Sequence, residues 1–421
     1  MLTVPPLGIK NNIGPISGTV AGATFAVLIC IIVVVVFKQK KKSNTEKIEG
    51  GSISSTPAKF IGKEVSIQSL LKGTILSPTQ EEFNHLEALD AKRSNDNTNL
   101  QGRKHNKKEI LNLHHYILPF DHNRVVLRTY INKSDYINAT WVSKASIERY
   151  DSLELVPYAP YPKINFIVAQ SPMKNTLPHH FQMVHENLTD VIVAINTREE
   201  NLFGILGQNK TFGNTMVRLR KRYKIHPTVF KSEIEISNKT SDARYCQNVT
   251  FFEFNEWPIQ LKAGEFSKDE MENFLSFFSL VRQEMILSKD EMTTIVHDAD
   301  GGVGPAALWV AMYELLQKVD ENMSTQNTKQ PSSNDDLGKL DVYRVVNDLR
   351  KQRSKMINCF ENYKLLFKLL QYYCQHKTIF DKIRAENEIP TEYLMSNDSN
   401  SNEDEYVLHD PSRYQDTYEN I

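Results

Sequence analysis

A glycine-rich turn between an apolar strand and an apolar helix constrains this chain most. Residues 297–307 read His-Asp-Ala-Asp-Gly-Gly-Val-Gly-Pro-Ala-Ala. Met292–Val296 before the turn is predicted to be a strand, and Ala306–Leu316 after it a helix. This order directs backbone N–H groups toward an anion site at the amino end of the helix. The pattern therefore predicts a loop with the form of a phosphate cradle.

Two aspartates lie inside this predicted cradle. Asp298 and Asp300 place negative charge where a phosphate would bind, and two unit charges about 4 Å apart repel by about 4 kcal/mol at an effective dielectric near 20. Pro305 removes one N–H donor, although its fixed φ suits the first turn of a helix. Two arrangements are open. One aspartate folds back and accepts the loop N–H groups in place of phosphate, or both point to solvent and the loop is open.

Composition excludes some classes of protein. The 421 residues are 40% hydrophobic and 24% charged with a net charge of −1, which fits one large domain with appendages or two small domains. The charge balance gives no indication of nucleic-acid binding. The four cysteines, Cys30, Cys246, Cys359 and Cys374, lack metal-ligand spacing and indicate a reduced compartment. We expect no metal and no cofactor.

The amino-terminal region predicts a membrane anchor. Residues 20–37 are almost wholly apolar, long enough to span a bilayer, and lysines follow at 38 and 40–42. The positive-inside rule then places residues 1–19 outside the cell as a short extracellular segment and the remainder in the cytoplasm of a plasma-membrane protein. A cleaved signal peptide is the alternative, but the apolar run is long and a lysine cluster follows it. Residues 38–59 are predicted to be a basic juxtamembrane linker.

Small residues lie on one face of this predicted span. Gly18 and Gly22 have the spacing of a helix-dimerisation motif, which predicts a homodimer contact. Glycine is also common in such helices, so the spacing alone is equally consistent with no contact.

Strands and helices alternate through the soluble part, which predicts an α/β fold. Strands are expected at Phe166–Ala169, Val191–Ile195, Met216–Tyr223, Ser232–Ile236, Asn248–Phe254 and Thr293–Val296. Helices are expected at His180–Glu186, Lys268–Leu287, Pro305–Val319, Val342–Lys351 and Glu361–Gln375, with helical periodicity also over Glu64–Leu89. Ser94–Lys108 is expected to be a surface loop, and Ser324–Lys339 a polar insertion.

Three features of the soluble part have simple interpretations. Trp309 is expected in the core, and His179-His180 at the surface. Arg218–Lys224 alternates as a strand with one charged face, typical of an edge that charge protects from pairing. Contact of this strand with anionic lipid is an alternative.

An acidic tail, residues 379–421, is predicted to be disordered. Its tyrosines are possible phosphorylation sites: Tyr393, Tyr406, Tyr414 and Tyr418. The last four residues, Tyr-Glu-Asn-Ile, resemble ligands of phosphotyrosine-reading domains that prefer asparagine two residues after the tyrosine. The tail therefore predicts docking of such domains, unless its tyrosines are incidental.

Several motifs occur in one order along the soluble part. They are Ile-Leu-Pro-Phe-Asp-x-x-Arg-Val at 117–125, Ser-Asp-Tyr-Ile-Asn-Ala at 134–139, Phe-Ile-Val-Ala-Gln-Ser-Pro at 166–172, Trp-Pro at 257–258 and Leu-Arg-x-Gln-Arg-x-x-Met at 349–356. Together they make residues 60–378 resemble the protein tyrosine phosphatase family, in particular its receptor-type branch. The resemblance implies a highly twisted central mixed sheet flanked by helices, an α/β (α+β) fold, behind one amino-terminal transmembrane helix.

The positions that perform the family's chemistry are changed. The family's loop reads His-Cys-x-x-Gly-x-Gly-Arg-[Ser/Thr]-Gly, so Asp298 stands at the cysteine nucleophile and Pro305 at the phosphate-binding arginine. Ile259 aligns with the general acid, Asn358 with the water-positioning glutamine, and His114 with the tyrosine that stacks on substrate. The vestigial phosphate loop is then formed by His114, Asp298, Asp300, Gly301, Gly302 and Gly304.

The resemblance implies a catalytically degenerate member, a pseudophosphatase that acts as a scaffold in phosphotyrosine signalling. Its partners would be an active phosphatase domain or phosphotyrosine-reading domains. Residual tyrosine phosphatase activity is an alternative. A remoter one is a magnesium-dependent aspartyl phosphatase, because Asp298-Ala-Asp300-Gly301 fits the short D-x-D-G signature of that class.

Overall fold

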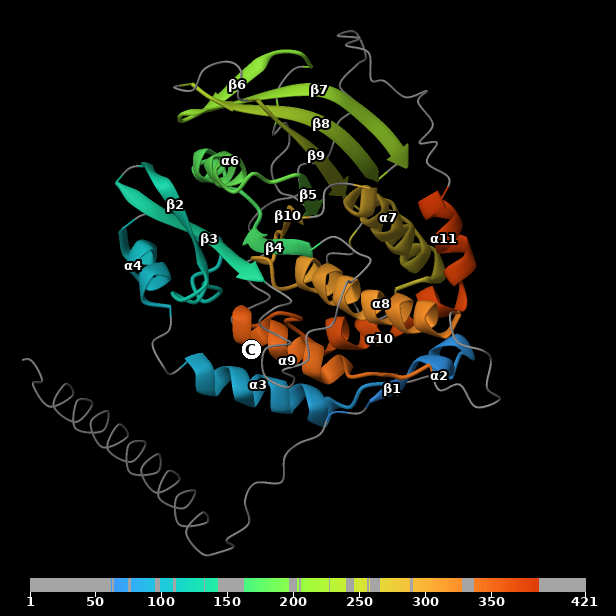
Figure 1. Cartoon of the computed structure of the whole chain (residues 1–421). Coiled ribbons are helices and arrows are strands. Elements are labelled where there is room, and N and C mark those ends of the chain that lie inside the picture. Colours follow the sequence, from blue (N-terminus) through green and yellow to red (C-terminus); the bar gives the residue numbers. More distant parts are fainter. Residues whose placement is uncertain are drawn as a thin grey trace, which may run out of the picture. The chain divides into compact units, whose positions relative to one another are not determined.

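A nine-stranded mixed sheet organises the computed structural model (Figure 1). Its order is β2-β3-β4-β10-β5-β9-β8-β7-β6, with β4, β10, β5 and β9 parallel and the flanking pairs antiparallel. The strands are β2 (Arg124–Ile131), β3 (Ser134–Val142), β4 (Lys163–Gln170), β5 (Val191–Ile195), β6 (Asn209–Phe212), β7 (Thr215–His226), β8 (Val229–Asn238), β9 (Gln247–Phe254) and β10 (Glu291–Asp298).

The structure describes residues 62–385, except 63, 75–76, 95–98, 109–110, 132, 143–162, 197–202, 204–205, 227, 240–245, 256, 258–265, 288–290 and 328–336. The helices are α2 (Ile67–Leu71), α3 (Gln80–Ser94), α4 (Leu100–Lys108), α6 (Leu177–Glu186), α7 (Lys268–Leu287), α8 (Pro305–Asn327), α9 (Val342–Gln352), α10 (Phe360–Gln375) and α11 (Lys377–Ala385). A short ladder pairs β1 (Val65–Ser66) with β11 (Lys339–Leu340).

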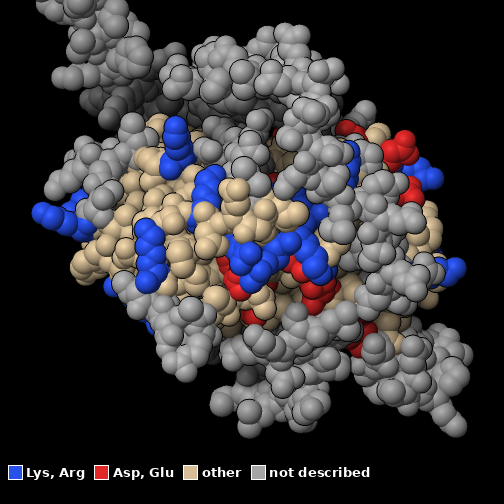
Figure 2. Space-filling view, turned by 90° about the horizontal axis from the view of Figure 1, so that it is seen from above, with Lys and Arg blue, Asp and Glu red and all other residues tan. Residues whose placement is uncertain are grey.

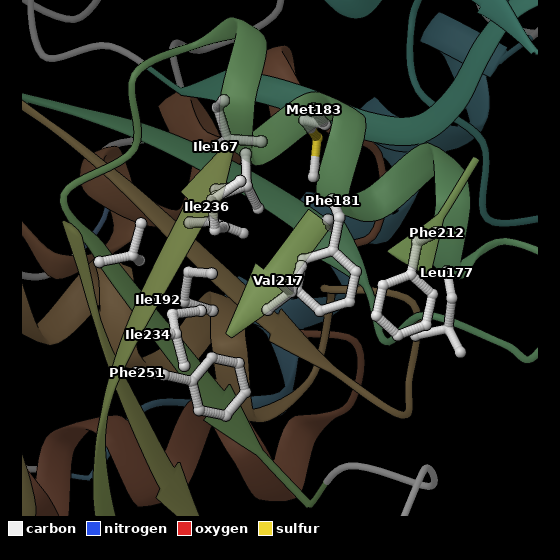
Figure 3. Packing of buried hydrophobic residues seen from close by; sticks show 14 of the residues in the cluster. Ile167, Leu177, Phe181, Met183, Ile192, Phe212, Val217, Ile234, Ile236 and Phe251 are labelled. Carbon is white, nitrogen blue, oxygen red and sulfur yellow. The ribbon is translucent and has the colours of Figure 1, made fainter. Parts of the chain in front are cut away.

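Alternation along the buried strands sends side chains into two layers. In β4, Ile167 and Ala169 join the cluster around α6, whereas Phe166 packs against Trp309 of α8 with ring centroids 5.9 Å apart. The β6–β7–β8 part of the sheet curves over α6 (Figure 1). In the resulting core, Phe181 of α6 stacks on Phe212 of β6 with centroids 4.6 Å apart (Figure 3).

Trp309 anchors α8 on the opposite face of the sheet. Its indole is fully buried and lies 5.2 Å from the ring of Phe278 on α7 and 5.9 Å from that of Tyr313 one turn further along α8. This confirms that Trp309 is a core residue. Because α8 starts at Pro305, the packing of Trp309 also fixes the position of the glycine-rich turn.

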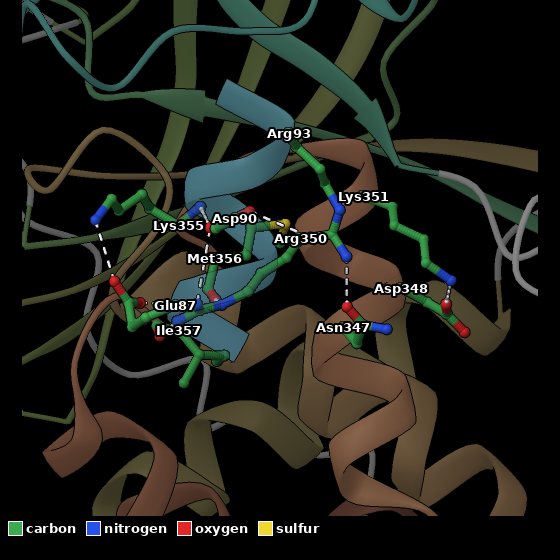
Figure 4. Close-up of polar contacts among 10 residues, drawn as sticks. All are labelled: Glu87, Asp90, Arg93, Asn347, Asp348, Arg350, Lys351, Lys355, Met356 and Ile357. Atoms are coloured by element: carbon green, nitrogen blue, oxygen red, sulfur yellow. Dashed lines mark hydrogen bonds and ion pairs between the residues drawn. The ribbon is translucent and has the colours of Figure 1, made fainter. Parts of the chain in front are cut away.

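Charged side chains tie α3 to the segment around α9 (Figure 4). Arg350 is fully buried; its guanidinium pairs with Glu87 at 2.7 Å and donates to the carbonyl oxygens of Met356 and Ile357. Asp90 accepts from the backbone N–H of Lys355 at 2.7 Å. These contacts hold the turn after α9 against α3.

All the strands predicted from the sequence, and all the helices from His180 onward, are confirmed. Three other predictions were wrong. Glu64–Leu89 is not one helix, because the chain turns at Gly73, whose φ is +75°, and divides into β1, α2 and α3. Ser94–Lys108 is not a loop throughout, since α4 occupies its second half, and α8 continues to Asn327 into the segment expected to be an insertion.

The carboxyl-terminal boundary also needs correction. The tail was predicted to begin at 379, but α11 is helical as far as Ala385. Lys377 at its start pairs with Asp320 of α8 at 3.0 Å, and Asp320 in turn pairs with Arg282 of α7 at 2.7 Å. This ion-pair cluster explains why the helix packs on the domain.

Within the described part of the chain, no helix combines the length and the apolar composition that crossing a bilayer requires. The predicted span at 20–37 and the segments at 1–19 and 38–59, including Gly18 and Gly22, lie outside the described residues, as do the four tail tyrosines.

Candidate functional site

The carboxylate of Asp298 lies inside the glycine-rich loop. One side-chain oxygen accepts the backbone N–H of Gly302 at 2.6 Å, and the other accepts that of Ala306 at 2.8 Å. The side chain is fully buried. Ala306 lies in the first turn of α8, so the carboxylate accepts one of the N–H groups that the helix start leaves without a partner, and Gly302 adds an N–H group of the turn itself. Asp298 thus folds back into the loop, and the arrangement with both aspartates in solvent does not occur.

Asp300 lies over the same loop from its outer side. A Cβ atom on Gly304 would be 2.5 Å from Oδ2 of Asp300, so the missing side chain of Gly304 leaves the space for this carboxylate. Burial, and then the charge of Asp300, raises the pKa of Asp298 to about 7, against the opposing effect of the Ala306 and Gly302 N–H groups and of Arg353. The loop therefore carries two acidic groups close enough to influence each other's ionisation.

Arg353 supports the loop from beneath. Its fully buried guanidinium donates to the carbonyl oxygen of Gly301 from both Nε at 3.2 Å and Nη2 at 2.6 Å. It also donates to Thr140 Oγ1 and Asn138 Oδ1 of β3, each at 2.7 Å. Burial lowers the pKa of Arg353 to about 10, which leaves the group charged at neutral pH. The guanidinium thereby fixes the loop backbone relative to the sheet.

Gly302 is required by both its backbone angle and its surroundings. Its φ is +77°, and a Cβ atom would lie 2.7 Å from the carbonyl oxygen of Ala169 in β4. We expect Gly302→Ala to lower the free energy of unfolding by about 2 to 3 kcal/mol, from the left-handed backbone and from overpacking. Thermal or denaturant unfolding followed by tryptophan fluorescence measures this, because all three tryptophans lie in this domain.

The chain offers a matched control for this substitution. Gly207 has a nearly identical φ of +78°, but nothing lies within 4 Å of the position its Cβ would take. Gly207→Ala should therefore cost only the backbone contribution, about 1 to 2 kcal/mol. Equal losses in the two variants would refute the close approach of Gly302 to β4.

Two histidines are buried behind the loop. The Nδ1 atom of His297 and the hydroxyl oxygen of Ser171 are 3.2 Å apart, and the rings of His297 and His180 are 5.3 Å apart. Burial lowers the pKa of His180 to about 4 and that of His297 well below its usual range, so both are neutral at physiological pH. The prediction that His179 and His180 lie at the surface was wrong, since the curved sheet encloses α6.

The rim of the loop contains two of the other predicted positions. His114 Nε2 lies 3.2 Å from the carbonyl oxygen of Ala299, so this imidazole borders the loop. The backbone N–H of Asn358 donates to the carbonyl oxygen of Val303 at 3.2 Å, and its side-chain oxygen accepts from Asn362 at 2.7 Å. Ile259 lies outside the described residues, although the neighbouring Trp257 is buried and accepts from Asn196 Nδ2 through its carbonyl oxygen.

Sequence reasoning did not assign a role to three residues that shape the site. Besides Arg353 and Asn138, Gln170 holds the segment before His114, because its side chain accepts from the N–H of Leu113 and donates to the carbonyl oxygen of Leu111. All three occur within the motifs quoted above. A polar residue within a motif that is otherwise expected to be buried was the sequence signal that could have identified them.

This chain belongs to the protein-tyrosine phosphatase family. The family model of that description matches residues 109–372. The chain is 22% identical over 320 residues to human receptor-type tyrosine-protein phosphatase alpha, covering 73% of this chain and 34% of that protein. It is 23% identical over 399 residues to chicken (Gallus gallus) receptor-type tyrosine-protein phosphatase eta, covering 90% and 24%.

A non-receptor relative matches as well. The rat (Rattus norvegicus) tyrosine-protein phosphatase non-receptor type 23 is 28% identical over 219 residues, which are 50% of this chain and 13% of that protein. The chain spans about a third or less of the length of these relatives.

Proposed function

We propose that this protein is a tyrosine-phosphatase-like interaction protein that does not hydrolyse phosphotyrosine. The observation that carries the proposal is the pair of hydrogen bonds from Gly302 and Ala306 to the Asp298 carboxylate. A phosphate dianion in the loop would need the same N–H groups and would meet the charges of Asp298 and Asp300. The side chain of Asp298 thus takes the place in the cradle that a phosphate would need.

The groups needed for turnover are also missing. Asp298 replaces the thiolate nucleophile, and Pro305 replaces the arginine that would hold the equatorial oxygens, a loss of roughly 1.5 to 3 kcal/mol per charged hydrogen bond. Ile259, at the general-acid position, has no proton to donate. These substitutions support an inactive loop rather than residual phosphatase activity.

The aspartyl-phosphatase alternative has weaker support. An aspartate that attacks phosphorus needs a free carboxylate oxygen and a metal ion to neutralise charge. Both oxygens of Asp298 accept backbone N–H groups, and the side chain is fully buried. This geometry disfavours Asp298 as a nucleophile.

Phosphate release and phosphate binding test the proposal together. We expect neither the full chain in detergent nor its Asp298→Ala variant to release phosphate from a tyrosine-phosphorylated peptide above the level without protein, with or without Mg²⁺. In calorimetry we expect Asp298→Ala to bind inorganic phosphate or vanadate at least tenfold more tightly than the unmodified chain, because the substitution frees two N–H donors and removes one negative charge. Phosphate release abolished by Asp298→Ala, or tight vanadate binding by the unmodified chain, would overturn the proposal.

The place of the protein in the cell is part of the same proposal. The apolar segment 20–37, the lysines after it and the receptor-type names of two relatives support a single membrane span at the plasma membrane with a cytoplasmic domain. Gly18 and Gly22 support a homodimer through that span. The tail tyrosines 393, 406, 414 and 418 support phosphotyrosine-reading partners, and the retained phosphatase frame supports pairing with an active phosphatase domain.

A further inference from the structure

The two edges of the nine-stranded sheet differ in how their backbone N–H and C=O groups are hydrogen-bonded. At the β2 end, the carboxylate of Glu186 accepts the backbone N–H groups of Arg128 and Thr129, both at 2.7 Å, and so occupies that edge. At the other end, β6 pairs with β7 only as far as Arg218, and Gly207 adds one bond to the carbonyl oxygen of Leu219. From residue 220 to 226, β7 pairs with β8 on one side, and among the described residues no strand pairs with its other side. This part of β7 is an open sheet edge.

The open edge is strongly basic. Arg218–Lys224 contains five cations in seven residues and no acid. Seen from the side of β6 and β7, Lys and Arg side chains gather over the middle of the face, with acidic side chains among them (Figure 2). Three of the cations form ion pairs with acids of the neighbouring strands: Arg220 with Glu235, Lys221 with Glu233, and Arg222 with Glu253. The pairs of Arg220 and Lys221 are partly exposed and contribute about 0 to 1 kcal/mol each, so a new anion can recruit these two cations at little cost, whereas Arg222 stays with the buried Glu253.

The cations extend to both faces of the sheet at this edge. Arg220 and Lys221 reach Glu235 and Glu233 on one face of β8. Arg222 and Lys224 lie against the ring of Phe230, which pairs with Glu253 on the other face. An added strand that alternates its side chains between the two faces would therefore meet positive charge on both sides.

We propose that residues 403–408 of this same chain, Glu-Asp-Glu-Tyr-Val-Leu, add to the β7 edge as a tenth strand. Three consecutive acids complement the five cations, with Glu403 and Glu405 on one face and Asp404 on the other. The Tyr-Val-Leu that follows has β-forming side chains, and backbone hydrogen bonds to an open edge are a common mode of peptide recognition. The positive charge of β7 opposes pairing with an apolar strand and favours pairing with an acidic strand.

The chain is long enough to reach this edge. The domain ends with α11, which packs on α7 and is held there by the pairing of Lys377 with Asp320. From Ala385 to Glu403 the chain has 18 residues, which extend to roughly 60 Å at about 3.3 to 3.6 Å per residue. A domain of this size has a radius of gyration of about 20 Å. The tail can therefore reach β7 within one molecule.

Hydrogen exchange of the β7 amides tests the inference. In the full chain we expect the amides of residues 220–226 that point away from β8 to exchange at least fivefold more slowly than in the triple variant Glu403→Lys, Asp404→Lys, Glu405→Lys. A chain ending at Ala385 should behave as the triple variant does. Reversing charge on both sides, with Lys221→Glu and Lys224→Glu added to Glu403→Lys and Asp404→Lys, should restore the protection that either pair alone removes.

Control experiments distinguish residues 403–408 from other possible partners of the β7 edge. Lys92→Glu with Lys174→Glu changes two exposed lysines away from β7 and should leave the protection unchanged. Protection within one molecule is independent of dilution, so protection lost on dilution would assign the edge to a second copy. Protection that the triple variant regains only on vesicles of anionic lipid would assign it to a membrane. Either result, or equal exchange in all variants, would overturn the inference.

Discussion

Replacing Arg353 with leucine is expected to lower the free energy of unfolding by about 3 to 5 kcal/mol. The guanidinium is fully buried and donates to Gly301, Asn138 and Thr140. Leucine would leave three buried acceptors without their donor and would remove the positive charge beneath Asp298. Since a domain of this kind is stable by only about 5 to 15 kcal/mol, the loss should be plain in denaturant unfolding.

Helix α9, which ends just before Arg353, provides the control for this prediction. Arg344 lies on the exposed side of α9 and reaches Asp348 only at 3.7 Å, so Arg344→Leu should change stability by less than about 0.5 kcal/mol. Arg353→Lys should fall between the two, because lysine keeps the charge but cannot reproduce the forked geometry. A loss below about 1 kcal/mol in Arg353→Leu would contradict the supporting role, since it would mean that the acceptors find other donors.

The fold was predictable from the sequence where buried elements show a simple pattern of apolar residues. The central strand β5 is buried at every position and is therefore a short apolar run, Val-Ile-Val-Ala-Ile, and β10 contains the buried pair Ile295-Val296. In contrast, α4 is polar along its length and packs through Gly102 and through His105, whose ring stacks on Tyr136 with centroids 4.7 Å apart. Such a helix depends on tertiary contacts that no local periodicity records.

The sequence predicted which residues form the candidate site, but not how their side chains are oriented. The motifs brought His114, Asp298 and Asn358 to one loop, where the structure also places them. Which aspartate would fold inward depends on Gly304, which leaves room for Asp300 outside, and on Arg353, which holds Gly301 from beneath. The Arg353 contact joins residues 52 positions apart, so the turn sequence alone left both arrangements open.

The inward carboxyl gives the loop a pH dependence whose sign can be worked out. The pKa of Asp298 rises from 3.8 to about 7 on folding, because burial and Asp300 disfavour its charged form more than the two N–H groups favour it. The folded state then binds this proton more tightly than the unfolded state does. Its contribution to stability is complete below pH 3.8 and is lost as the pH rises to about 7, by about 1.4 kcal/mol per pH unit and about 4 kcal/mol in all.

Asp298→Asn isolates this contribution, because asparagine does not titrate. At pH 5 the variant should be the less stable protein by about 1 to 3 kcal/mol, since its amide nitrogen meets one of the two N–H donors and cannot accept it. Between pH 5 and 7.5 the unmodified chain should lose about 2 to 3 kcal/mol relative to the variant, so the gap should close or reverse. Denaturant unfolding of both proteins over this range, analysed as a difference, removes the titration of all other groups.

Asp300→Asn distinguishes burial from charge repulsion as the cause. Asp300 is the second contribution to the raised pKa, and burial is the first. With Asp300→Asn, the pH at which stability is lost should move lower, yet a dependence on Asp298 should remain. A difference curve between Asp298→Asn and the unmodified chain that is flat from pH 5 to 7.5 would show that the buried carboxylate stays ionised throughout. The two N–H groups and Arg353 would then outweigh its burial, and the loop would hold a permanent internal anion.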